Sequence, residues 1–352
     1  MAEALRIGFL GGVPPAMGGG GLEVQMRRTA TALEARGHTI VELASAPAGA
    51  AWDVAHAFGA EGDVQHVLAH WTRRRTPYVV SPVIVASPGI DEAAVVLGAR
   101  VPGIATHAGM RRRALQGADA LVAITAYERR VIRRLAGRGA RVVVVPNGAD
   151  VVAPTAAGGA GPVDTGTVPP PEGAAPGALA PPAGAARGGH VLLLGAVSAR
   201  KRQREVVEAL TGTGTVVVAG AFAGPAGELA EWEEAVRRGG ATWLGEVSDP
   251  AAVARLQRDA VALVHLSRAE VQSLAVIETL AHGTPVVLSD IPSHRELAAA
   301  YPGWVRLAAG PEEVRGLVAG LRALPPAGPP PRIPSWDDVA QQLEALYRSL
   351  LA

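Results

Sequence analysis

The chain has 352 residues, of which 49% are hydrophobic, 18% are charged and none is cysteine. This composition excludes a disordered chain, and the length allows two domains that each bury a core. Disulfides and thiolate metal sites are excluded as well. The chain opens on no apolar leader, and no apolar run approaches the ~20 residues of a membrane span. We therefore expect a cytoplasmic protein.

The net charge of +1 is unevenly distributed along the chain. Residues 1–153 contain 17 Arg against 12 acidic residues, and many of these arginines lie at 111–113 and 129–141. Basic helical surfaces can contact an anionic membrane or an anionic acceptor. A solvated surface in an arginine-rich chain is the simpler interpretation. Contact with a membrane surface stays an open expectation, and we expect no nucleic-acid partner.

The first part of the chain has the pattern of a Rossmann-like domain. An apolar strand at 6–10 opens on the glycine-dense loop "GGVPPAMGGGG", and a helical pattern at 23–36 follows. The strands are apolar nearly throughout, which is typical of a parallel sheet covered by helices on both faces. Further apolar runs predict strands at 39–43, 54–57, 78–85, 120–124 and 141–145, and a basic helix at 127–135.

The glycine loop does not predict a nicotinamide-binding site. Glu42 falls roughly as far beyond the glycines as the dinucleotide fingerprint requires. However, when the fingerprint is started at Gly18, its sixth position is Glu23 instead of glycine. The loop is also too long and too rich in proline for a tight pyrophosphate turn. We therefore do not predict a dehydrogenase.

The composition changes abruptly to Pro, Gly, Ala and Thr over 154–188, where a flexible or polyproline-like linker is expected. A second Rossmann-like domain follows over 189–334. Ser335 then caps a last amphipathic helix at 336–350. In the second domain we expect strands at 191–194, 215–219, 241–244, 261–266, 285–288 and 304–307, and helices at 203–210, 228–238, 250–258, 272–282 and 312–324.

The stretch "HLSRAEVQSLAVIETLAHGTPVVL" contains two carboxylates, Glu270 and Glu278, eight residues apart. They lie on a loop and on the helix that follows it. Free N–H groups at the start of that helix, those of Ser273 and Leu274, are suited to an anion. A solvated helix face is the common explanation of such a pair. The alternative is a ligand held at both ends with an anion between, which is the layout of a nucleotide sugar.

Lys201 is the single lysine among 33 basic residues. It lies in "GAVSARKRQREVVEAL", directly after the strand at 191–194. A compact ammonium differs from a planar guanidinium. A lone lysine in an arginine-rich chain therefore indicates a position that needs this point charge, although basic clusters before helices are more often solvent-facing.

These segments resemble the family 4 glycosyltransferases. The resemblance is carried by "GGGGLEVQMRRTATALEARGHTIVEL", by "VVVVPNGAD", and by the spacing of Glu270 and Glu278 with "HGTPVVLSD" after it. It implies the GT-B fold, an α/β architecture of two Rossmann-like, doubly wound domains facing across a cleft. The acceptor domain would then span 1–153 and the nucleotide-sugar donor domain 189–334, with 335–352 crossing back to the first domain.

The resemblance also implies a retaining glycosyl transfer. Glu278 would hold the ribose hydroxyls and Glu270 the hydroxyls of the transferred sugar. Lys201 and the N–H groups of Ser273 and Leu274 would hold the diphosphate. No Asp-x-Asp occurs in the chain, so we expect no metal and no resident cofactor, the nucleotide-diphosphate sugar being a co-substrate.

Near the glycine loop, Gly20 and Gly21 would let the backbone approach the donor phosphate or the transferred sugar. The acceptor, a small molecule or a glycan, cannot be read from these residues.

Two features of the family are missing. Ala196 stands where relatives carry an arginine, and Arg200 or Arg202 is left to supply its charge. No histidine follows the strand at 78–85. Two alternatives therefore stay open, a nucleotide-sugar epimerase and a nucleotide-sugar-binding protein without turnover. A hydrolase using the two glutamates explains neither Lys201 nor the glycine loop.

Overall fold

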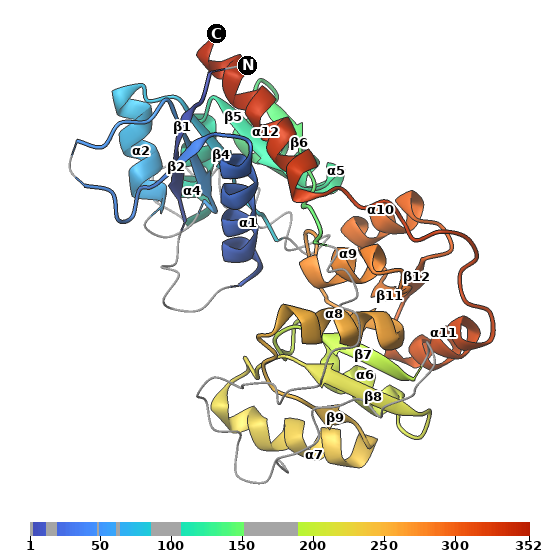
Figure 1. The fold of residues 1–352 in the computed structure, drawn as a ribbon. Coiled ribbons are helices and arrows are strands. Elements are labelled where there is room, and N and C mark those ends of the chain that lie inside the picture. The colour runs from blue at the N-terminus through green and yellow to red at the C-terminus, as the bar shows by residue number, and fades with distance from the viewer. Residues whose placement is uncertain (1–2, 12–19, 48, 61–63, 86–106, 151–188) are drawn as a thin grey trace. The chain divides into compact units, whose positions relative to one another are not determined.

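The computed structural model describes residues 3–11, 20–47, 49–60, 64–85, 107–150 and 189–352 (Figure 1). The predicted linker at 154–188 and most of the glycine loop lie outside the described residues. The chain forms two compact units. The first contains Met1–Ala149, Ala269–Leu274 and Pro334–Ala352, and the second contains Asp150–Arg268 and Ala275–Ile333.

The first unit is built on a six-stranded parallel sheet with the order β2-β1-β3-β4-β5-β6. The chain starts in the middle of the sheet, adds β2 on one side and then continues from β3 on the other. The strands are β1 (Arg6–Leu10), β2 (Thr39–Glu42), β3 (Val54–Phe58), β4 (Tyr78–Ser81), β5 (Ala120–Ala123) and β6 (Val142–Val144). The helices between them are α1 (Gly21–Ala35), α2 (Val64–Arg74), α4 (His107–Gln116) and α5 (Ala126–Ala136).

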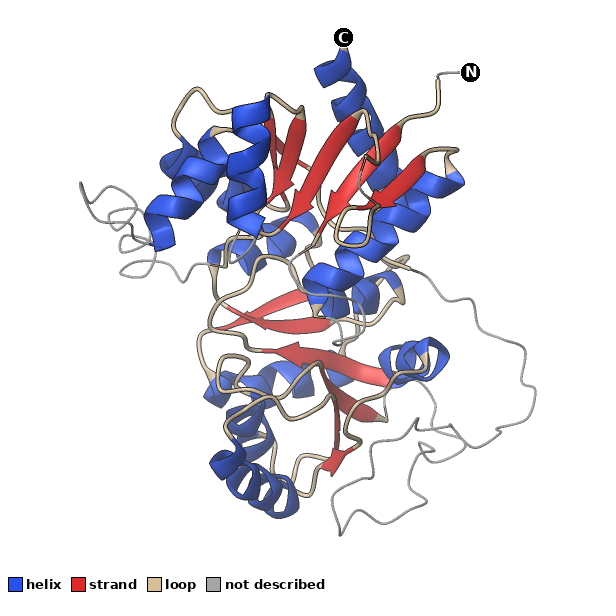
Figure 2. Ribbon diagram, turned by 90° about the vertical axis from the view of Figure 1, so that its left-hand side faces the viewer, coloured by secondary structure: helices blue, strands red, loops and turns tan. Residues whose placement is uncertain are grey.

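Apolar residues fill both faces of this sheet, as its uniformly apolar strands require. On one face Leu68, Leu115 and Ile132 bring α2, α4 and α5 into one buried cluster. On the other face Leu33 of α1 packs with residues of the C-terminal helix. Figure 2 shows helices on both sides of the strands.

The second unit has its own six-stranded parallel sheet, ordered β12-β11-β10-β7-β8-β9. Its core contains a fully buried Trp232 and the inner residues of the central strands. The strands are β7 (His190–Leu194), β8 (Thr215–Ala219), β9 (Thr242–Trp243), β10 (Ala260–His265), β11 (Val286–Ser289) and β12 (Val305–Ala308). The helices are α6 (Gln203–Ala209), α7 (Leu229–Gly239), α8 (Pro250–Asp259), α9 (Leu274–Ala281), α10 (Pro292–Ala300) and α11 (Pro311–Ala323), with a 3-10 turn, η2 (Ala226–Glu228).

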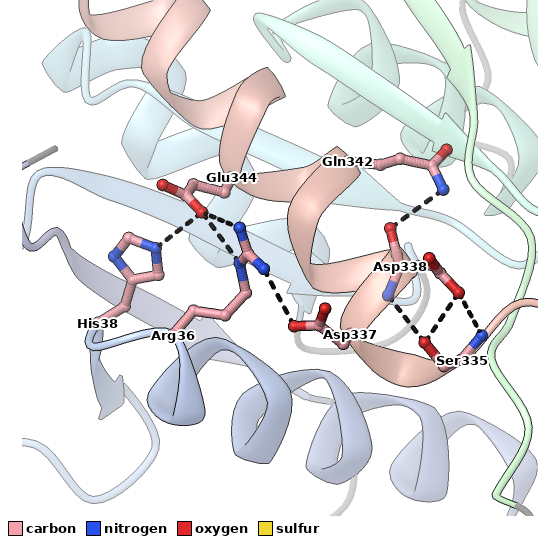
Figure 3. A network of polar contacts seen from close by, with 7 residues as sticks. All are labelled: Arg36, His38, Ser335, Asp337, Asp338, Gln342 and Glu344. Carbon is pink, nitrogen blue, oxygen red and sulfur yellow. Dashed lines mark hydrogen bonds and ion pairs between the residues drawn. The ribbon is translucent and has the colours of Figure 1, made fainter. Parts of the chain in front are cut away.

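The C-terminal helix α12 (Trp336–Leu351) belongs to the first unit and lies along α1 (Figure 1). Ser335 and Asp338 form a reciprocal capping box at its start (Figure 3). Arg36 at the end of α1 donates to the carboxylates of Asp337 and Glu344, at 3.0 Å each (Figure 3). An apolar stripe along α12 completes the core on this face of the sheet.

The prediction of two Rossmann-like, doubly wound domains is confirmed by the two sheets. Several element boundaries differ from the prediction. The strand expected at 78–85 ends at Ser81, because Pro82 has no N–H to donate and Val83 has a φ of 46°. The helix expected from residue 272 begins at Leu274. Helices α2, α4 and α10 were not predicted.

Candidate functional site

The carboxyl edge of the second sheet has a switch point between β7 and β10. These two strands are parallel neighbours, yet the chain leaves β7 toward β8 and leaves β10 toward β11. Ligands of doubly wound sheets bind where the loops diverge in this way. Lys201 lies in the connection after β7, and Glu278 lies in α9 after β10.

The connection after β7 is held in place by the side chain of Gln203, the first residue of α6. Its amide nitrogen donates to the carbonyls of Gly195 and Ala196, and its amide oxygen accepts from the N–H of Ser198. Gln203 is buried, with 5% of its surface exposed. A buried side chain with these three partners fixes the loop as a unit.

The ammonium of Lys201 lies against Gly195, the first residue after β7. A Cβ built on Gly195 would be only 2.6 Å from the Lys201 Nζ, and the φ of Gly195 is 110°. The backbone conformation therefore favours glycine here, and a larger residue would displace the ammonium. The predicted point charge is thus placed at the carboxyl end of a central strand.

Arg200 is joined to the end of β10. Its Nη1 donates to the Ser267 hydroxyl at 3.1 Å, and its carbonyl accepts from the N–H of Arg268 at 2.9 Å. Arg202 has a different partner: its Nε donates to the carboxylate of Glu205 at 2.9 Å. The loops after β7 and β10 are therefore connected through Arg200.

A chain of buried polar groups lies beneath this connection. The Ser267 carbonyl accepts from the Ser289 hydroxyl at 2.5 Å, and that oxygen lies 3.1 Å from Nδ1 of His294. Ser267 and His294 are both fully buried. Sequence reasoning missed these residues, since isolated Ser and His residues at strand ends carry no distinct signal.

Glu278 is half-buried on α9, in the second unit. By contrast, Glu270, Ser273 and Leu274 belong to the compact first unit. The side chain of Gln272 accepts from the N–H of Asn147 at 2.8 Å, and Leu274 packs on the apolar cluster that α1 and α12 share. All four of these residues follow β10 in sequence, and of the four only Glu278 belongs to the second unit.

Gly20 and Gly21 form the start of α1. Gly20 is the N-cap, with extended backbone and no side chain to bond the first-turn N–H groups. Both glycines are exposed, and a Cβ on Gly21 would meet no atom within 4 Å. Packing within the described residues therefore does not explain a glycine at position 21.

In the middle of β3, His56 is fully buried. Its Nε2 lies 2.8 Å from the Ser81 hydroxyl and its Nδ1 lies 2.6 Å from the Tyr347 hydroxyl. Burial lowers the pKa of His56 to about 3. The ring is therefore neutral at physiological pH and holds α12 to β3 and β4, which is a structural role.

Glu128 is a second buried polar group of the first unit, and sequence reasoning missed it. Its two carboxylate oxygens accept from the N–H groups of Ile84 and Ile124, both at 2.7 Å. Burial raises its pKa to about 7, against the opposing effect of these two hydrogen bonds. Glu128 therefore fixes the segment after β4, where Val83 has a left-handed backbone. The sequence does contain one sign of this position, because Thr125 three residues before Glu128 forms the pattern of a helix capping box.

Within the described ranges, no group of three or more His, Asp and Glu side chains is arranged to hold a metal ion. Nor does any helix in that part of the chain have the length and apolar character needed to cross a membrane.

Comparison with known families matches both domains. Residues 42–148 match the family described as "Glycosyl transferase 4-like domain", and residues 184–324 match "Glycosyl transferases group 1". The two ranges together take up more than half of the chain. The chain belongs to the glycosyltransferases. A comparison with curated proteins finds no match.

Solved structures show that this glycosyltransferase has the predicted GT-B fold. Sucrose-phosphate synthase from Thermosynechococcus elongatus aligns with a TM-score of 0.70 and 17% identity, covering 98% of this chain and 99% of that one. HepE from Anabaena, solved with UDP and glucose, aligns with a TM-score of 0.64 and 16% identity, covering 98% of this chain and 100% of that one. AviGT4, described as a glycosyltransferase involved in avilamycin A biosynthesis, aligns with a TM-score of 0.54 and 18% identity. The alignment covers 99% of this chain and 98% of that one.

Two of the basic residues predicted for the donor site of this glycosyltransferase lie in the loop after β7. Lys201 and Arg200 bring two cationic groups to the switch point of the second sheet, one over Gly195 and one on Ser267. Such an edge can stabilise an anion that forms during a reaction.

Proposed function

We propose that the protein transfers a sugar from a nucleotide-diphosphate sugar to a hydroxyl acceptor, with retention of the anomeric configuration. The observation that carries this proposal is the Lys201 ammonium, seated over Gly195 at the switch point of the second sheet. The match of both domains to glycosyltransferase families supports it. Further support comes from HepE, a structure of the same fold that was solved with UDP-glucose.

The chemistry of the transfer explains why fixed cations are needed. The bond between the anomeric carbon and the diphosphate oxygen breaks, and its electron pair stays on the diphosphate. The acceptor hydroxyl bonds to the anomeric carbon on the same face, and its proton passes to the departing phosphate oxygen. Lys201 stabilises the negative charge that develops on that oxygen, which lowers the barrier because the charge is already in place.

The remaining residues would bind the two ends of the donor. Glu278 accepts from the ribose hydroxyls and Glu270 from the hydroxyls of the transferred sugar. The N–H groups of Ser273 and Leu274, at the start of α9, contact the diphosphate.

In this proposal Lys201 and the helix terminus replace a metal ion, so activity should survive chelation by EDTA. No resident cofactor is required. Gly20 and Gly21 leave room for the sugar or phosphate at the start of α1, and the acceptor, a small molecule or a glycan, binds to the first domain. The reaction would take place in the cytoplasm.

A panel of UDP-, GDP-, ADP- and dTDP-sugars tests the proposal, with nucleotide release as the readout and EDTA present in parallel. We expect release from at least one donor, and a loss of about 10²-fold or more in rate for Lys201→Ala. The proposal would be overturned by donor binding without release, which indicates a binding protein, or by an epimerised donor with its nucleotide still attached. A Lys201→Ala variant with normal rates would contradict the role given to Lys201.

A further inference from the structure

We infer that Glu128 is a positioning residue for the acceptor, because it holds Val83 and Val85 at the carboxyl edge of the first sheet as an apolar contact surface. The inference rests on the proposed function and makes its acceptor side more specific. The acceptor it points to carries an apolar group next to the hydroxyl that receives the sugar. All three residues belong to the first unit.

The segment after β4, residues 82–85, lies where a ligand of this sheet is expected. The chain leaves β1 toward β2 and leaves β3 toward β4, so the switch point of the first sheet lies between β1 and β3. Ligands of doubly wound sheets bind beyond the carboxyl ends of the strands at such a point. Strand β4 pairs with β3, and residues 82–85 continue from its carboxyl end. We therefore place the acceptor against this segment.

Val83 has a backbone conformation that a valine adopts only under constraint. Its φ is 46°, and of the three non-glycine residues with a left-handed backbone in the described ranges it alone is β-branched. Such a conformation costs free energy and persists only where the surrounding structure imposes it. Strained residues of this kind concentrate at sites that bind ligands. The strain at Val83 thus favours a role in binding over a role in packing.

The chain is anchored on both sides of Val83. Before it, the Ser81 hydroxyl lies 2.8 Å from Nε2 of the buried His56. After it, the N–H of Ile84 donates to Glu128 at 2.7 Å, and the Ile84 side chain is buried in the core. These contacts fix the backbone of Val83 from both directions, which is the condition under which a strained residue persists.

Glu128 also connects this segment to the next strand. Its second carboxylate oxygen accepts from the N–H of Ile124, the residue after β5, at 2.7 Å. Only 1% of Glu128 is exposed, and burying a carboxylate costs free energy that a neutral side chain would not cost. Stability alone therefore does not account for an acid here. A carboxylate is suited to this position because it accepts strongly from two backbone N–H groups at once.

Alternate side chains of the segment face in opposite directions. Pro82 and Ile84 are buried, whereas Val83 is half-buried and Val85 is 46% exposed. Val85 is one of only three large apolar side chains that are exposed within the described residues. An apolar group of a ligand gains free energy by covering such a surface. The segment therefore suits an acceptor that brings an apolar group to this edge.

Two glycosides that differ only in their aglycone test the inference, phenyl β-D-glucoside and methyl β-D-glucoside. Binding is followed by NMR of protein with labelled valine methyl groups, because the Val83 and Val85 signals report the contact without turnover. We expect phenyl β-D-glucoside to shift both signals and to bind about 5-fold or more tightly than methyl β-D-glucoside. Val85→Ser should remove most of this preference without changing the unfolding temperature, since position 85 is exposed.

Glu128→Gln keeps the size of the side chain but accepts from one N–H group only. We expect it to lower the affinity for phenyl β-D-glucoside by about 5-fold or more, and to raise its KM by a similar factor with a much smaller change in kcat. Affinity for UDP, measured by calorimetry, should change by less than about 2-fold. Asp119→Ala is the matched control, because Asp119 accepts from the N–H of Tyr78 at 2.9 Å, at the other end of β4. It should lower the unfolding temperature and leave glycoside binding unchanged.

The inference is overturned if phenyl β-D-glucoside leaves both valine signals in place, or if Glu128→Gln and Asp119→Ala weaken its binding equally. A folded Glu128→Gln variant that binds this glycoside as the wild type does would overturn it as well. Thermal unfolding of each variant separates these results from misfolding. If the wild type releases no nucleotide from any donor, the proposed transfer fails, while the glycoside titrations still decide whether Glu128 positions a binding surface.

Discussion

The Nζ of Lys201 occupies the space that a Cβ of Gly195 would need, at a separation of only 2.6 Å. The two residues are six positions apart, and they meet because the loop between them folds back over the end of β7. The lysine depends on the glycine for its place, so a change at either residue acts on the same cationic group.

Gly195→Ala should therefore impair donor chemistry through Lys201. The new methyl group displaces the ammonium, and we expect nucleotide release to fall by about 10-fold or more. The φ of 110° adds backbone strain on the order of 1–2 kcal/mol. Gly212→Ala is the matched control, because Gly212 has a φ of 75° with no atom within 4 Å of its Cβ position. Equal losses of activity in the two variants would show that strain alone is responsible.

Tyr347→Phe should loosen the C-terminal helix from the first domain. The substitution leaves the shape intact and removes the hydroxyl that lies 2.6 Å from Nδ1 of the buried His56. An unsatisfied buried group costs about 1–3 kcal/mol, which urea unfolding would register. Tyr301→Phe is the control, since its hydroxyl makes no hydrogen bond within the described residues. An unfolding free energy unchanged by Tyr347→Phe would refute the structural role of His56.

Local pattern predicted the strands, since a buried parallel strand is an uninterrupted apolar run. It also singled out Lys201. It could not predict the partners of Arg200 and Arg202, because Ser267 and Glu205 lie outside the motif.

Two further relationships were out of reach for the same reason. The donor domain predicted at 189–334 includes Glu270. Gln272 bonds to Asn147, 125 positions earlier, and the loop belongs to the first unit. The bond between His56 and Tyr347 joins residues 291 positions apart. Contacts of this kind depend on the whole fold, so the sequence of a short segment does not predict them.

Gly148→Ala should displace the start of α12. A Cβ at this position would lie 2.6 Å from the backbone nitrogen of Trp336 and 2.8 Å from the carbonyl carbon of Ser335. Backbone atoms cannot move aside cheaply, so we expect a loss of about 1–3 kcal/mol in unfolding free energy. Hydrogen exchange should become faster in the first turns of α12. Gly139→Ala, where the Cβ meets nothing within 4 Å, should be close to neutral, and a similar loss in both variants would contradict the steric argument.

Glu128 should make the first domain less stable as the pH rises through neutrality. Its pKa is raised to about 7 in the folded state from an ordinary value of 4.5. The folded protein therefore binds the proton more tightly between these two values. The resulting stabilisation is complete below pH 4.5 and is lost as the pH rises through about 7, a change of up to about 3 kcal/mol.

The measurement compares urea unfolding of the wild type and of Glu128→Gln at pH 5, 6, 7 and 8. The variant is less stable at every pH, because a glutamine amide cannot accept from both Ile84 and Ile124. It should nevertheless lack the decline that the wild type shows between pH 6 and 8. His56 acts in the opposite direction, with a folded pKa of about 3 that lowers stability as the pH falls below 6.5. Above pH 6.5 the contribution of His56 is nearly constant. A wild-type decline between pH 6.5 and 8 that persists unchanged in Glu128→Gln would therefore assign the titration to another group.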